Sequence, residues 1–168
     1  MEQIWDVAPV AGLAPPYDLL AGILQDGTRE WRFEMSPDLP ADAVVWQPYP
    51  GMHSIGGILL HIMGVEILWF ERYVLDQEVT ADEAKQLMLM QTDVDAWQWP
   101  EPPRLPLVEY FEWHDRVRAR MLEGMKCWPP ADQVLYPDED ARTARWVLGH
   151  VIQHEAYHGG QAVLLRRL

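Results

Sequence analysis

The sequence predicts an all-α protein of the four-helix-bundle class, and two observations carry that prediction. Long stretches whose apolar residues recur with a period near 3.6 alternate with breaks that are rich in proline. No alternating apolar and polar stretch is bounded by hairpin turns, so the sequence carries almost no strand signal. Four long helices with long connections are typical of a helical bundle. The length of 168 residues suits a single domain over 1–168.

The first half of the chain is expected to hold two of the four long helices. Residues 1–15 form an irregular arm, and a helix over about 17–35 follows from apolar residues at a rough helical period, namely Leu20, Ile23, Leu24, Trp31 and Met35. The stretch 36–51 contains four prolines and a glycine, so it cannot be one continuous helix. A second helix begins after Ser54, a good N-cap, and runs to about Leu75. Because it is apolar over most of its circumference, we expect it to be buried between other helices.

The second half is expected to hold a short helix and two further long ones. A capping box at the start of TADEAKQLMLMQ predicts the short helix over 80–91. After a Pro-rich loop, an amphipathic pattern predicts the third long helix over about 107–127. A second long break occupies 128–142, and the fourth long helix is predicted over 142–168.

Composition excludes several classes of function. A net charge of −13 makes nucleic-acid binding a poor hypothesis, because the phosphate backbone would be repelled. No apolar run reaches the length of a membrane span, and the N-terminus lacks the pattern of a secretory signal. Cys127 is the one cysteine, which excludes an intrachain disulfide framework and gives no sign of a nucleophile. We therefore expect a cytoplasmic protein that binds neither nucleic acid nor membrane.

Half of the six histidines lie in HVIQHEAYHGGQ, within the predicted last helix. Residues four apart on a helix lie on nearly the same face, so His154 can pair either with His158 or with His150. His150 and His158 are about 12 Å apart along the axis, too far to share one ion easily. Neutral imidazole is a common ligand for zinc, nickel, copper and iron. The three histidines therefore offer one helical ligand pair, and their spacing leaves open which pair it is.

A third ligand would have to come from another helix, and His61 in ILLHIMG is the obvious source. A histidine among apolar residues needs a hydrogen-bond partner or a metal to offset its desolvation. Three protein ligands leave a coordination position open, as in catalytic zinc sites. The competing interpretations are a satisfied core histidine at position 61 and a chance pair on a partly exposed helix face. His53 and His114 are expected to have no metal role, and His114 lies in an acidic stretch that looks exposed.

Several other polar residues have weaker predicted roles. Glu155 and Gln161 flank the histidines and could orient them or a bound water, although a solvated face explains them equally well. Glu66 lies one turn beyond His61 in an apolar run and could be a buried partner of Arg145 or Arg142.

Two segments resemble the DinB/YfiT-like superfamily of bacterial four-helix-bundle metalloproteins. MHSIGGILLHIMGVEILWF is similar to that family's His-Ser-Ile-Gly helix start with a central ligand histidine and a following Glu. RWVLGHVIQHEAYHGGQAVLLRRL is similar to its C-terminal helix, in which a His-x-x-x-His pair is followed by Gly-Gln. The lead VVWQPYPG also resembles the family's Trp-x-Pro approach to the first of these helices. The resemblance covers nearly the whole chain and is strongest over 45–75 and 142–168.

The resemblance implies a bundle with up-down-down-up topology and a homodimer. It also implies a divalent metal ion, zinc or nickel, held by His61, His154 and His158. This ligand set selects the pair His154 and His158 over the pair His150 and His154. Tyr157 departs from the pattern, because many relatives have a further histidine there. That position is not expected to bind metal, so the tyrosine is expected to change the polarity of the pocket and not the ligand set.

The resemblance also implies a function, because several members of the superfamily are transferases or isomerases that use thiols such as bacillithiol or mycothiol. The first hypothesis is thus a metal-dependent transferase that joins a low-molecular-weight thiol to a small electrophile. An arginine is expected to line the pocket, with Arg72, Arg142 and Arg145 as candidates. The alternatives are a metal-binding stress-response protein without catalysis and a metal-dependent hydrolase with Glu155 as general base.

Overall fold

The computed structural model describes residues 6–89, 92, 98–136 and 141–168. Within them the chain is mostly helical, which confirms the predicted all-α class. The helices and strands are α1 (Tyr17–Phe33), α2 (Ala41–Val45), α3 (Ile55–Glu66), the π-helix η1 (Ile67–Val74), α4 (Ala81–Gln86), α5 (Leu107–Gly124), the 3₁₀ turn η2 (Met125–Cys127), β1 (Val134–Leu135), β2 (Arg142–Thr143) and α6 (Ala144–Arg167). Residues 6–16, before α1, form no helix or strand.

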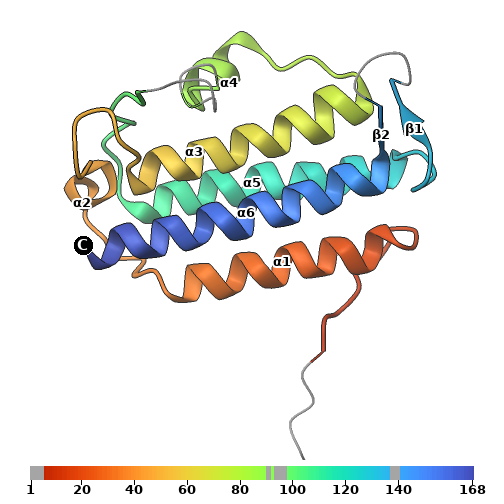
Figure 1. The fold of residues 1–168 in the computed structure, drawn as a ribbon, viewed down its shortest axis with the longest axis horizontal. Helices are drawn as coiled ribbons and strands as arrows, with labels where there is room; N and C mark the ends of the chain where they lie inside the picture. Colours follow the sequence, from red (N-terminus) through yellow and green to blue (C-terminus); the bar gives the residue numbers. More distant parts are fainter. Residues whose placement is uncertain (1–5, 90–91, 93–97, 137–140) are drawn as a thin grey trace, which may run out of the picture.

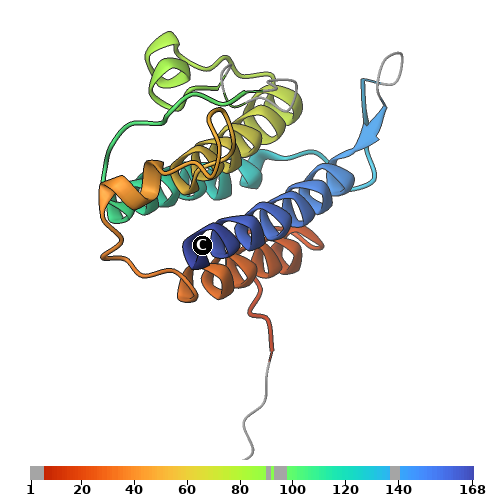
Figure 2. The same cartoon turned by 60° about the vertical axis from the view of Figure 1, so that its left-hand side comes forward.

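The long helices α1, α3, α5 and α6 lie side by side (Figure 1). Helix α6 packs against α1 on one side and α3 on the other, and α3 also packs against α5 (Figure 2). Every residue of 55–63 is buried, as the apolar circumference of this segment predicts. The core gathers apolar side chains from all four helices, among them Leu24, Ile58, Met121 and Leu148. Among the described residues, no helix is long and apolar enough to cross a membrane.

The helix boundaries largely follow the local capping chemistry. The Ser54 hydroxyl accepts a hydrogen bond of 3.1 Å from the backbone N–H of Gly57, so the predicted N-cap of α3 is confirmed. The Thr80 hydroxyl caps α4 in the same way, although α4 ends at Gln86 rather than near residue 91. Residues 90 and 91 of that prediction lie outside the described part of the chain.

The structure corrects the sequence prediction at the two Pro-rich breaks and at one helix end. The first break contains the short helix α2. The second contains an antiparallel pair of two-residue strands, in which Val134 faces Thr143 and Leu135 faces Arg142. Arg142 therefore belongs to a strand, and α6 begins two residues later, with the Thr143 hydroxyl as its cap. Two-residue strands are too short to show an alternating pattern, so no strand is predictable at these positions.

The second long helix changes its hydrogen-bonding pattern before it ends. It runs as an α-helix to Glu66 and then as the π-helix η1 to Val74, close to the predicted end. π-Helical segments are rare and are frequently found at functional sites. Here η1 continues the helix that carries His61.

Candidate metal centre

The three histidines singled out in the sequence meet between α3 and α6. His61, His154 and His158 each offer one ring nitrogen, and these atoms lie within 4.8 Å of one another. The Nε2 atoms of His61 and His154 are 3.0 Å apart. The ring centroids of His154 and His158 are 4.3 Å apart, and those of His61 and His158 are 4.7 Å apart. The packing of α3 on α6 thus brings together residues that are about ninety positions apart in the sequence.

The fourth histidine in the neighbourhood, His150, lies one turn away from this group. Its ring stacks on Trp146 with an interplanar angle of 6° and meets the edge of Trp69. Its centroid is 6.0 Å from that of His154. The structure therefore groups His61 with His154 and His158. His150 belongs to an aromatic cluster beside this group.

Hydrogen bonds fix the orientation of two of the three rings. His61 Nδ1 donates to the backbone carbonyl of Thr92 at 2.6 Å, since a carbonyl can only accept. His158 Nδ1 lies 2.7 Å from Oε1 of Gln161, which is one of the two predicted orienting residues. Partners of this kind on the outer nitrogen set the tautomer of a metal-binding imidazole and leave Nε2 as the donor atom.

Burial favours the neutral form of His154 and His158, which is the form that binds a metal. It lowers the pKa of His154 to about 3, with smaller contributions from His158 and His61 nearby. Burial also lowers the pKa of His158 and that of His53, whose ring stacks on Trp99 at 3.9 Å. In a tetrahedral site the nitrogens lie about 2.0–2.1 Å from zinc and hence about 3.3–3.4 Å from one another. The spacing of 3.0 Å between His61 and His154 is close to this, so the donor set fits a divalent metal.

A network of buried charges lies among α1, α3, α5 and α6, on a neighbouring face of α6. Glu66 and Glu155 are both nearly inaccessible to solvent, and the guanidinium of Arg118 joins them. Arg118 donates to Glu66 through Nε at 3.0 Å and through Nη2 at 2.7 Å, and it also donates to Glu155. The expectation that Glu66 pairs with Arg145 or Arg142 is therefore wrong. The partner, Arg118, is supplied by α5, which packs against α3.

His114 completes this network, contrary to its predicted exposure. Its side chain is fully buried, its Nε2 lies 2.8 Å from Glu66, and Arg32 donates to its Nδ1 at 2.7 Å. Because Nδ1 accepts, the ring proton is on Nε2 and is donated to Glu66. Glu155 receives further hydrogen bonds from Thr28 and from the indole of Trp31, at 2.5 and 3.1 Å. These contacts place the Glu155 carboxylate among α1 and α5 rather than beside the histidine group.

The carboxylates and imidazole of this network could in principle hold a metal of their own, since Glu66, His114 and Glu155 also lie within 4.8 Å of one another. The guanidinium of Arg118 already binds both carboxylates, and its charge would repel a second cation. The network is thus a structural ion cluster that ties α6 to α1, α3 and α5.

Comparison with known proteins decides the family of the chain. The family described as MST: Mycothiol-S-transferase matches residues 20–168, which include all four long helices apart from the start of α1. The chain belongs to this family. Mycothiol-S-transferases are DinB/YfiT-like, so the resemblance to that superfamily is confirmed. A comparison with curated proteins gives no match.

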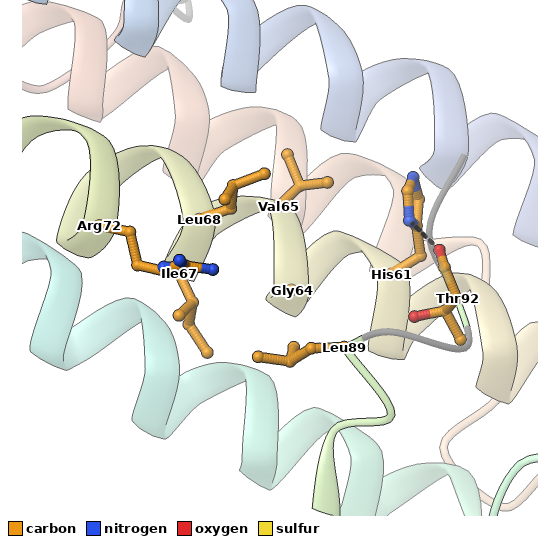
Figure 3. Close-up of a pocket in the computed structure, with 8 residues that line it drawn as sticks. All are labelled: His61, Gly64, Val65, Ile67, Leu68, Arg72, Leu89 and Thr92. Atoms are coloured by element: carbon orange, nitrogen blue, oxygen red, sulfur yellow. Dashed lines mark hydrogen bonds between the residues drawn. The ribbon is translucent and has the colours of Figure 1, made fainter. Parts of the chain in front are cut away.

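In this member of the mycothiol-S-transferase family, a small pocket opens beside the histidine group. It has a volume of about 110 Å³ and runs from His61 to Arg72 along α3 and η1 (Figure 3). Arg72 is the one candidate arginine that lines it. The Arg142 guanidinium instead lies over the rings of Trp69 and Trp146, at 4.9 and 4.8 Å from their centroids. Arg145 is not among the residues of this pocket.

Proposed function

We propose that this chain is a metal-dependent transferase that joins a low-molecular-weight thiol, such as mycothiol, to a small electrophile. His61, His154 and His158 would hold the divalent metal, zinc or nickel. The convergence of three imidazoles from two helices, beside an open pocket, carries the proposal. The name of the family supports the choice of thiol transfer over other metal chemistry.

The residues of the chain would prepare the site for this reaction. Thr92 and Gln161 hold two rings so that their Nε2 atoms converge, and three protein ligands leave at least one coordination position for a substrate. When bound, a divalent metal with an open position lowers the pKa of a thiol. In the transfer itself, the sulfur bonds to the electrophilic carbon, and the leaving group departs with its bonding electron pair. The thiol proton passes to solvent.

Turnover tests this proposal directly. Thiol consumption with a small alkyl halide should require zinc or nickel and should stop when a chelator removes the metal. His154→Ala should abolish turnover, whereas His150→Ala should retain it, because His150 lies outside the histidine group. A metal-loaded protein that consumes no thiol with any electrophile would favour the alternative, a metal-binding stress-response protein without catalysis.

The hydrolase hypothesis has less support from the contacts around Glu155. A general base must reach the water that it activates, and this carboxylate already accepts hydrogen bonds from Thr28, Trp31 and Arg118. Metal-dependent ester cleavage that Glu155→Gln abolishes would restore the hypothesis.

The remaining expectations from the resemblance belong to the same proposal. They are a single-domain four-helix bundle with up-down-down-up topology, a homodimer and a cytoplasmic location. Sedimentation equilibrium of the purified protein tests the homodimer, and a mass of one chain at micromolar concentration would contradict it.

A further inference from the structure

The pocket beside the histidine group has two chemically different ends. His61 and Thr92, whose backbone carbonyl accepts a hydrogen bond from His61, lie at one end. Arg72 lies at the other end (Figure 3). The wall between them is apolar and consists of Gly64, Val65, Ile67, Leu68 and Leu89. A volume of about 110 Å³ is somewhat smaller than the ~150 Å³ of an apolar cavity that takes up benzene. The pocket therefore suits a compact ligand with an apolar body.

Arg72 is available to bind a ligand. Within the part of the chain that the structure describes, it makes no hydrogen bond or ion pair with a protein group. Arg120, on the neighbouring helix α5, instead pairs with both Glu71 and Glu83. Figure 3 shows the guanidinium of Arg72 turned towards Ile67, into the end of the pocket that is opposite His61. A guanidinium in this position can offer two parallel N–H groups to a carboxylate.

The π-helical turn brings Ile67 and Arg72 closer to one side of the helix. Ile67 and Arg72 are five residues apart, and both line it. In an α-helix, side chains five apart point to different sides, whereas i→i+5 hydrogen bonding brings them closer to one side. Residues 67–74 form the π-helix, and Ile67, Leu68 and Arg72 from this segment line the same cavity as His61.

A second cavity limits the charge of the ligand. It has a volume of about 260 Å³ and shares Leu68 and Arg72 with the first, but Asp76 and Glu78 also line it. A ligand that extended beyond Arg72 with further negative charge would meet these carboxylates and be repelled. The two cavities together favour a single negative charge that ends at Arg72.

We propose that this pocket binds the electrophilic substrate as a small monocarboxylate, with the carboxylate on Arg72 and the carbon that is attacked at the His61 end. The inference rests on the proposed transferase function and names the substrate class for it. The pocket should prefer a carboxylate over a neutral analogue, because the neutral analogue would leave the Arg72 guanidinium without an anionic partner. In a chain of net charge −13, a local cation of this kind is also needed to offset the general repulsion of an anion.

A matched pair of electrophiles tests the substrate class. 4-Bromocrotonate and 4-bromocrotonamide share a carbon skeleton and a leaving group, and in both the thiol sulfur displaces bromide. After correction for the uncatalysed reaction, the metal-loaded protein should show a higher kcat/KM for the acid. In Arg72→Gln the ratio of acid to amide should fall about 10-fold or more, as expected for the loss of a charge-assisted hydrogen bond. Arg72→Lys should lose less, and the control Arg116→Gln, at an exposed position on α5, should keep the wild-type ratio.

Binding of unreactive ligands separates this inference from the proposed reaction. Crotonate should bind the protein more tightly than crotonamide in a calorimetric titration, and Arg72→Gln should remove the difference. The inference is overturned if Arg72→Gln leaves the acid-to-amide ratio or the preference for crotonate unchanged. If no electrophile is turned over but crotonate binding still depends on Arg72, the transferase proposal is wrong and the anion pocket stands.

Discussion

Arg118 joins two buried carboxylates that come from different helices, so its charge matters more than that of an exposed arginine. Replacing it with methionine keeps much of the volume but leaves Glu66 and Glu155 without their cation. Removal of one partner from a buried ion pair costs about 3–5 kcal/mol. We predict that Arg118→Met lowers the free energy of unfolding by that amount in urea denaturation. Arg116→Met, at an exposed position on the same helix, is the control and should change stability by less than about 0.5 kcal/mol.

The same cluster should make the protein sensitive to acid. Burial raises the pKa of Glu66, but the charge of Arg118 and hydrogen bonds from Arg118 and His114 outweigh it, so the pKa falls from 4.5 to about 2. The carboxylate thus contributes stability that is fully present above about pH 4.5 and is lost as the pH falls towards 2. Denaturant unfolding between pH 5 and 2 should show a steep decline in the wild type and a shallower one in Glu66→Gln. Equal slopes in the two proteins would contradict this assignment.

Single site residues are predictable from the sequence where a spaced motif contains them. The His-x-x-x-His pair and the histidine of ILLHIMG lead to the group that the structure assembles, although their role as metal ligands stays a prediction. His114 was missed because its acidic neighbours Glu112 and Asp115 suggested an exposed face. A usable signal existed, since His114 shares a helical spacing with Tyr110 and Val117, and all three are buried.

Helix α6 contributes one face to the histidine group and another face to the buried ion cluster. His154 and His158 face α3, whereas Glu155 and Gly159 face α1 and its side chain Trp31. A methyl group added at Gly159 would lie 2.6 Å from atoms of the Trp31 indole, so this position requires a glycine for α1 and α6 to pack closely.

Two neighbouring glycines give a matched test of this close approach. We predict that Gly159→Ala destabilises the protein by about 1–3 kcal/mol, because overpacking moves Trp31 away from Glu155. Gly160→Ala, where nothing lies within 4 Å of the added methyl, should be neutral or stabilise by up to about 1 kcal/mol through helix propensity. Thermal unfolding of both variants measures the difference. A Gly159→Ala protein as stable as Gly160→Ala would show that α1 and α6 can separate without cost.

At the level of elements, the sequence predicted the long helices well and the connections poorly. Helical periodicity and the Ser54 and Thr80 caps located the start of α3, the end of η1 and the start of α4, because these signals are local. The β1–β2 pair and α2 are too short for any periodic signal, and they are stabilised by their contacts with the rest of the chain. The π-helical turn η1 was not predictable either, because its hydrogen bonding depends on how the helix packs.

At the scale of the whole molecule, the proposed metal site lies between two pairs of packed helices, α3 with α5 and α6 with α1. His61 belongs to α3, which packs against α5, and the other two histidines of the group belong to α6, which also packs against α1. The buried ion cluster around Arg118 also joins α3, α5 and α6, through Glu66 and Glu155. The family match spans nearly all of these elements, which agrees with a site that needs the whole packing rather than one motif.

The metal content of the purified protein tests the central claim most directly. Elemental analysis after reconstitution with zinc or nickel should give about one ion per chain for the wild type and for His150→Ala, since three ligands suffice for such a site. His61→Ala, His154→Ala and His158→Ala should each lose most of the metal while circular dichroism shows a folded helical protein. Unchanged metal content in any of these three variants, or loss of metal in His150→Ala, would contradict the proposed ligand set.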